Sequence, residues 1–166
     1  ESLMEKSTVL ESVMKEFRAL AAIPRPSGHE KAVSDYLLAH LQEMGLEAVQ
    51  DERGNIIADL AAAPGRENAP RVILQGHMDM VCVAAPGVSY DPLQDAIELV
   101  EEGDVLRAKG TSLGADDGIG VAIILHILRH VKENGPVRAI FTVDEERGMT
   151  GAIHLEEKYL KDAQYL

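Results

Sequence analysis

A long apolar helix between two short apolar strands is the feature that most restricts the fold of this chain. Apolar residues lie on nearly every side of the stretch 118–131, which predicts a buried helix rather than one with a solvent-exposed face. The runs 71–75 and 137–143 before and after it are short and apolar, as buried strands are. Strand, helix and strand in this order predict an α/β layered fold.

The remaining segments add helices and hairpins to this unit. A capping box at Thr8 and another at Ser27 predict helix starts, and the apolar spacing predicts helices that end near Ala21 and Met44. Prolines between the two segments must interrupt any helix there. Two hairpins and a last helix are also expected, with strands at 47–50 and 56–60, strands at 97–100 and 105–108, and the helix at 152–160.

Composition excludes several classes of protein. Acidic residues outnumber basic ones 28 to 16, and the net charge of −12 argues against nucleic acid or an anionic membrane as the main partner. Cys82 is the single cysteine, which excludes an internal disulfide framework and favours a reducing compartment. No apolar run approaches the roughly 20 residues that span a bilayer. With 46% hydrophobic residues, a folded globular chain is expected.

Three polar clusters interrupt the apolar pattern, each at an end of a buried element. They lie at 76–79 after the first apolar strand, at 114–118 before the buried helix, and at 144–148 after the second apolar strand. In open α/β sheets, ligands bind outside the carboxyl ends of the strands. We therefore expect the three clusters to converge on one site.

The first cluster pairs a histidine with an aspartate. If the strand continues, His77 and Asp79 share a face, because side chains alternate along a strand. Imidazole is a good zinc ligand, and a metal-bound histidine usually donates its other N–H group to a carboxylate. The alternative is an ordinary strand-end histidine beside a solvated aspartate.

The other two clusters each contain adjacent carboxylates. One of Asp116 and Asp117 suffices to cap the helix, and the other can present a carboxylate that bridges two metal ions about 3.5–4 Å apart. Glu145 and Glu146 repel each other unless a cation or a proton lies between them. One of the two glutamates can bind a metal while the other acts as a general base. The alternatives are a simple helix cap and a surface charge pair.

Taken together, one histidine and several carboxylates without cysteine suit zinc or manganese in a two-metal site. Such ions lower the pKa of bound water and polarise a carbonyl, so the predicted chemistry is hydrolysis. His126 and His130 also have the spacing of a metal pair, but the glutamate of His-Glu-x-x-His is missing. We expect these two histidines to be structural.

Longer motifs surround the three clusters. They read Gln75-Gly-His-Met-Asp-Met-Val-Cys82, Lys109-Gly-Thr-Ser-Leu-Gly-Ala-Asp-Asp-Gly-Ile-Gly120 and Phe141-Thr-Val-Asp-Glu-Glu-Arg-Gly-Met-Thr-Gly-Ala152. These motifs resemble the M20 metallopeptidase family, and most closely its aminoacyl-histidine dipeptidase branch. The loop Ile23-Pro-Arg-Pro-Ser-Gly28 is also similar to the N-terminal loop of that branch.

The resemblance implies a role for each candidate residue. It implies two divalent metal ions, in the first place zinc, with manganese or cobalt as alternatives. His77 would bind one ion, Glu146 the other, and Asp116 both, with a cis peptide bond following Asp116. Asp79 would orient the site, and Glu145 would be the general base.

The resemblance also implies that residues 1–166 are the N-terminal part of a catalytic domain. That domain would be a zinc-peptidase-like αβα structure with a mixed, mostly parallel sheet. In the family a further aspartate ligand, a distant histidine ligand and an inserted lid or dimerisation domain all follow the part represented here. We expect a cytoplasmic, homodimeric full-length dipeptidase that hydrolyses aminoacyl-histidine (Xaa-His) peptides, and an inactive fragment. The alternatives are a non-catalytic module that binds a metal or a partner chain, and an M20 tripeptidase or N-acyl amino acid deacylase.

Overall fold

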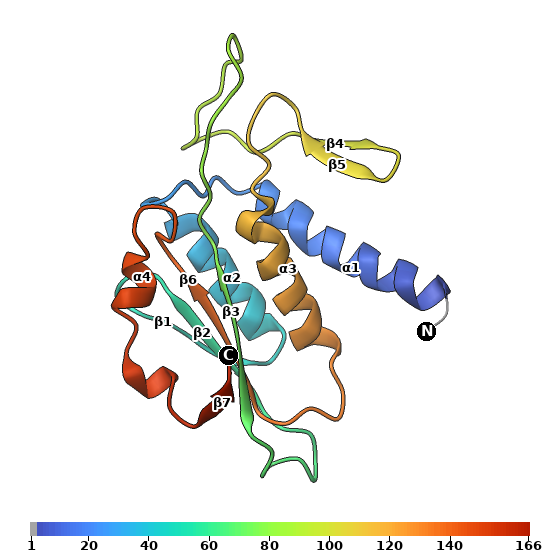
Figure 1. Ribbon diagram of the computed structural model, residues 1–166, viewed down its shortest axis with the longest axis vertical. Coiled ribbons are helices and arrows are strands. Elements are labelled where there is room, and N and C mark those ends of the chain that lie inside the picture. The colour runs from blue at the N-terminus through green and yellow to red at the C-terminus, as the bar shows by residue number, and fades with distance from the viewer. Residues whose placement is uncertain (1–2) are drawn as a thin grey trace.

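The computed structural model describes residues 3–166, with side chains described from residue 8 onward. Its centre is a five-stranded sheet in the order β1-β2-β6-β3-β7 (Figure 1). The strands are β1 Glu47–Gln50, β2 Ile56–Leu60, β3 Arg71–His77, β6 Val137–Thr142 and β7 Ala163–Tyr165. β1 and β2, and β2 and β6, pair antiparallel, whereas β6 and β3, and β3 and β7, pair parallel. The predicted α/β fold with a mixed sheet is confirmed, with parallel and antiparallel pairings in equal number.

Helices cover one face of this sheet. α2 (Lys31–Glu43) and α3 (Ala115–His130) pack on the strands, and α1 (Leu3–Ala21) packs on α3 (Figure 1). Leu37 of α2, Leu125 of α3 and Phe141 of β6 are fully buried in the main core between helices and sheet. α3 is therefore enclosed by α1 on one side and the sheet on the other, which explains why its sequence is apolar nearly all round.

The opposite face of the sheet is covered by a thinner layer from the C-terminal segment. Ile57, Ile73 and Ile140 of three strands are buried there beneath Leu155 and Tyr159. The segment contains a one-turn helix α4 (Thr150–Ile153) and a 3-10 helix (Glu157–Tyr159). Every residue of β6 is buried, because this central strand is covered on both faces. The layers are thus αβα, although the second helical layer is short.

The predicted helix at 152–160 is wrong. The chain leaves the helical conformation after Ile153, and Glu156 is extended (φ −66°, ψ 132°). This break lets Leu155 and Tyr159 both reach the sheet, whereas Ile153 stays exposed. Burial against the sheet therefore overrides local helix preference in this segment.

Both predicted capping boxes are also wrong. α1 begins at Leu3, so Thr8 lies inside the helix. α2 begins at Lys31, and its N-cap residue Glu30 makes no side-chain capping bond. The Ser27 hydroxyl instead donates to the Asp79 carboxylate at 2.6 Å. The Ser27 hydroxyl, which local spacing predicted to cap the helix, therefore binds Asp79, 52 residues later.

The strand predictions fare better. The bounds of β1 and β2 agree with the predicted strands, and the turn between them joins an antiparallel pair. The second hairpin forms a separate sheet of β4 (Leu99–Glu102) and β5 (Val105–Ala108), which projects beyond the main sheet (Figure 1). β3 extends to His77, two residues further than the predicted apolar run. The edge strand β7 was not predicted from the sequence.

Candidate metal centre

The three polar clusters meet at one edge of the sheet, as their positions in the sequence predict. β3 and β6 are parallel neighbours, with His77 paired in register to Thr142, so the clusters that follow them lie side by side. α3 runs back along the sheet and begins at this same edge (Figure 1). As a result, Nε2 of His77 lies 3.0 Å from Oδ1 of Asp116 and 3.8 Å from Oε2 of Glu145.

A group of potential metal ligands forms around His77. Within residues 3–166, His77, Glu145 and Glu146 are the group whose ligand atoms all lie within 4.8 Å of one another. His77 is buried, whereas the Asp116 side chain is 85% exposed. His77 therefore lies at the buried bottom of the group, and the carboxylate atoms face outward. Nitrogen and oxygen donors without sulfur suit zinc or manganese.

The orientation of the His77 ring is set by its Nδ1 atom. Nδ1 lies 3.0 Å from the backbone oxygen of Asp79 and 3.3 Å from that residue's Oδ1. Both of these oxygens are acceptors, so Nδ1 carries a proton and Nε2 is left facing the carboxylates. Burial alone would lower the pKa of His77, but Asp79 and Asp116 outweigh it and raise the pKa to about 9.

The buried carboxylate of Asp79 connects three segments. It accepts hydrogen bonds from the Ser27 hydroxyl at 2.6 Å and from the backbone N–H groups of Glu145 and Glu146 at 3.1 and 3.2 Å. Burial tends to raise its pKa, but these donors and His77 outweigh burial and hold the pKa of Asp79 well below its usual range. An ionised Asp79 thus fixes the loop that presents Glu145 and Glu146.

Asp116 and Asp117 point in different directions. The peptide bond between them is cis, as the family resemblance implied. Oδ2 of Asp117 accepts the backbone N–H of His77 at 3.2 Å. A Cβ atom at Gly120 would collide with the Asp117 carboxylate, so this glycine makes room for it. Asp117 therefore ties α3 to β3, while Asp116 faces His77.

The carboxylates at this edge repel one another. Glu146 is exposed, and slight desolvation together with the negative charges of Glu145 and Asp116 raises its pKa. A bound cation would remove this repulsion, so the residues present fit a divalent metal ion.

Comparison with known proteins agrees with this geometry. The model for peptidase family M20/M25/M40 matches residues 73–166, which is more than half of the 166 residues. The chain belongs to this family. The match includes all three clusters.

Relatives of the M20 chain include named dipeptidases. It is 37% identical over 148 residues to the cytosol non-specific dipeptidase of Escherichia coli, covering 87% of this chain and 30% of that protein. The aminoacylhistidine dipeptidase of Vibrio alginolyticus superposes with a TM-score of 0.87 at 39% identity, over 93% of this chain and 32% of that one. A tripeptidase from Staphylococcus aureus superposes with a TM-score of 0.75 at 25% identity, over 92% of this chain and 41% of that one. The chain therefore spans about a third of the length of these relatives.

Several residues that support the M20 site were not predicted from the sequence. Oε2 of Glu30 accepts the backbone N–H of Asp144 at 2.6 Å. Asp144 has a left-handed backbone (φ 56°), and its carboxylate accepts Arg147 Nε at 2.8 Å and the Thr150 hydroxyl at 2.6 Å. These contacts fix the backbone at Asp144, directly before Glu145 and Glu146. Asp144 belongs to the third polar cluster of the sequence, but no local pattern predicted that Glu30 would contact it.

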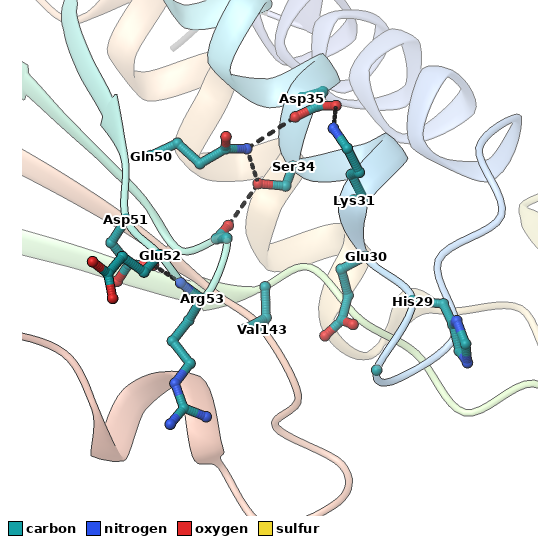
Figure 2. A pocket seen from close by; sticks show the side chains of 12 residues that line it. His29, Glu30, Lys31, Ser34, Asp35, Gln50, Asp51, Glu52, Arg53 and Val143 are labelled. Atoms are coloured by element: carbon teal, nitrogen blue, oxygen red, sulfur yellow. Dashed lines mark hydrogen bonds and ion pairs between the residues drawn. The ribbon is translucent and has the colours of Figure 1, made fainter.

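A pocket of about 420 Å³ lies beside this support, between the start of α2 and the β1–β2 turn (Figure 2). Glu30 and Val143 line it, and Gln50 Nε2 donates to the Ser34 hydroxyl across its upper wall. None of the five predicted site residues is among its lining residues. The pocket is thus separate from the metal-ligand group.

Two further findings concern the rest of the M20 chain. His126 and His130 both lie near the Ser12 hydroxyl of α1, at 2.7 and 3.4 Å, so they join α3 to α1 as structural residues. Among residues 3–166, no helix is both long enough and apolar enough to cross a membrane.

Proposed function

We propose that the protein carrying this chain is a metal-dependent dipeptidase. The observation that carries the proposal is the convergence of Asp116 and Glu145 on Nε2 of His77, from three segments that are distant in sequence. The two dipeptidases among the relatives, at 37% and 39% identity, support the same reaction class.

We assign His77 as ligand of one ion, Glu146 as ligand of a second ion, and Asp116 as ligand of both. When bound, the ions polarise the scissile carbonyl and lower the pKa of water. Zinc is the first choice, and manganese or cobalt are the alternatives, because the donors are imidazole and carboxylate. His77 would bind the ion as a neutral imidazole, so ion binding would compete with protonation of the ring, which Asp79 and Asp116 favour.

Glu145 is the proposed general base. Its carboxylate is half-exposed at the rim of the site and its Oε2 lies 3.8 Å from Nε2 of His77. It takes a proton from the attacking water at a carboxylate oxygen and returns the proton to the leaving amine nitrogen. The backbone N–H of Glu145 is held by Asp79, which keeps the base in place.

The proposed substrates are dipeptides, including the aminoacyl-histidine type. The Vibrio relative is named for aminoacylhistidine dipeptides and the Escherichia coli relative for non-specific dipeptide hydrolysis. The tripeptidase similarity is weaker, at 25% identity, so we place tripeptides second.

We further propose that residues 1–166 are the N-terminal part of a catalytic domain. The support is that the chain covers only 30% and 32% of the two dipeptidases. The remaining ligands would come from the rest of the full-length protein, which we expect to be a cytosolic homodimer, and the fragment alone would be inactive.

The test is hydrolysis of a panel of Xaa-His and other dipeptides by the full-length protein, before and after chelation. We expect about two bound ions per chain and turnover that chelation abolishes and zinc, manganese or cobalt restores. Cleavage that is unaffected by chelation would contradict the proposal. Faster cleavage of tripeptides than of dipeptides would replace the proposed substrate class.

A further inference from the structure

Arg25 is a buried cation that touches two parts of the metal centre. It lies in the loop between α1 and α2 and is 1% exposed. Its Nη1 donates to the backbone oxygen of Met78 at 3.0 Å, and its Nη2 donates to that of Gly114 at 2.8 Å. Met78 directly follows His77, and Gly114 precedes Asp116 by two residues. One planar group therefore links the backbone segments that carry these two residues.

The turn before Asp116 is shaped around this guanidinium. A Cβ atom at Gly114 would lie 2.6 Å from Nη2 of Arg25, and one at Gly118 would lie 2.7 Å from it. Gly114 also has a left-handed backbone (φ 77°). The backbone of Arg25 adds a third tie, because its carbonyl accepts the N–H of Met80 at 3.0 Å.

Stability alone does not explain this arginine. Within the described part of the chain, Arg25 forms no ion pair. Its Nε atom is buried and has no hydrogen-bond partner there. Burial lowers the pKa of Arg25, and the nearby Cys82, Asp79 and Asp117 act against that effect. Burying a charge with incomplete partners is costly, and an apolar side chain of similar volume is often at least as stabilising.

We propose that Arg25 is a positioning residue for the metal centre, which sets the separation of His77 and Asp116 by holding the Met78 and Gly114 carbonyls on one rigid guanidinium. The inference rests on the proposed function, since it assumes that these two residues bind metal. A guanidinium presents its donors at fixed spacing in one plane, whereas the lysine ammonium is a single point on a flexible stem.

The test measures metal affinity in the full-length protein, by zinc titration against a chelating dye, together with the melting temperature of the metal-stripped protein. Arg25→Met removes the donors but keeps an unbranched apolar stem, and Arg25→Lys keeps the charge without the paired donors. We expect both to weaken zinc binding about 10- to 100-fold, the range typical for residues that orient metal ligands. Affinity within twofold of the unmodified protein in either variant would overturn the proposal.

Arg138 offers a matched control. It is also buried, but its guanidinium binds Asp59 at 2.7 and 2.9 Å and the Tyr159 carbonyl at 2.9 Å, at the opposite end of β6. Arg138→Met should lower the melting temperature and leave zinc affinity unchanged. An equal loss of affinity in Arg138→Met would reduce the effect of Arg25 to general destabilisation and overturn the proposal. So would failure of both Arg25 variants to fold while Arg138→Met folds.

A third variant separates this inference from the proposed function. His77→Ala should abolish tight zinc binding. If the unmodified protein binds no zinc, or His77→Ala binds it equally well, the proposed metal site itself is wrong. If His77→Ala loses zinc and either Arg25 variant retains it, only the role of Arg25 is wrong.

Discussion

Nε2 of His77 lies 3.0 Å from Oδ1 of Asp116, although 39 residues separate them in the sequence. One residue ends a strand and the other begins a helix, so neither element alone determines the distance. The neighbouring Asp117, which accepts the His77 N–H, and Arg25, which binds the carbonyls of both segments, hold the two elements at this separation. The geometry of the candidate site therefore depends on the contacts around it as well as on the proposed ligands.

Replacing the proposed base should separate metal binding from turnover. Glu145→Gln keeps the size of the side chain and the backbone N–H that Asp79 holds, but it removes the proton acceptor. We expect metal content to stay unchanged and kcat for dipeptides to fall about 10²- to 10⁴-fold, the usual contribution of a general base. Metal analysis and steady-state kinetics on one preparation of the full-length protein measure both. Turnover close to that of the unmodified enzyme would remove Glu145 from the mechanism.

Asp79→Asn should damage both stability and metal binding. An amide cannot present two acceptor oxygens to Ser27, Glu145 N–H and Glu146 N–H together, so a buried donor loses its partner. We expect a loss of about 1–3 kcal/mol in the free energy of unfolding. We also expect metal affinity to fall about 10- to 100-fold.

Chemical denaturation and zinc titration measure these effects. The matched control is Asp35→Asn, since Asp35 is an exposed aspartate of α2 whose carboxylate binds Lys31 and Gln50. That variant should leave both quantities nearly unchanged, because exposed ion pairs contribute little. Equal effects of the two substitutions would refute the linking role of Asp79.

Gly120→Ala should destabilise the protein, although alanine has a higher helix propensity than glycine. In an ordinary helix, Gly→Ala stabilises by up to about 1 kcal/mol. Here the new methyl group would meet the Asp117 carboxylate and displace it from the His77 N–H. Overpacking of this kind costs about 1–3 kcal/mol. An increase in the unfolding free energy on denaturant titration would show that Asp117 has room to move.

Acid should weaken the pair of buried Glu16 and half-buried His40, which joins α1 to α2. Glu16 accepts a hydrogen bond from His40 Nε2 at 2.9 Å, and Arg129 lies 3.7 Å away. Burial alone would raise the pKa of Glu16, but His40 and Arg129 outweigh it and lower the pKa. A lowered folded-state pKa means that the contribution is complete above the unfolded value, about 4.3, and is lost as pH falls through the folded value.

The free energy of unfolding of Glu16→Gln should therefore lie below that of the unmodified protein by about 1–2 kcal/mol at pH 7. The difference should stay constant down to about the unfolded pKa of 4.3 and shrink as pH falls further through the lowered folded value, because protonation removes the same charge that the substitution removes. Urea titrations of metal-stripped protein across this range measure the difference. A gap that stays constant with pH would mean that the Glu16 charge does not stabilise the fold.

Much of the fold followed from local pattern. Strands β1 and β2 were predictable because both flank a turn with glycine and asparagine. The breadth of the apolar surface of α3 indicated a buried helix. The polar clusters indicated the site, since parallel neighbours β3 and β6 must end at the same edge of the sheet.

Other features could not be read from neighbouring residues. Ser27 looked like a helix cap, but its partner is Asp79, 52 residues later. Glu30 looked like part of the same cap, but it binds the N–H of Asp144, 114 residues later. The last helix was misplaced because Leu155 and Tyr159 are buried against strands that local spacing does not include.

The sequence by itself determined the fold class and the edge where the site lies, and its resemblance to the M20 family implied the five residues proposed to act there. Apolar periodicity and polar residues at element ends are local, and they specify which groups a strand or helix presents. Only the tertiary structure decided how those groups are held, through Arg25, Ser27, Glu30 and Asp117. A buried donor or acceptor must find a partner wherever the packed chain supplies one, and that choice depends on the whole fold.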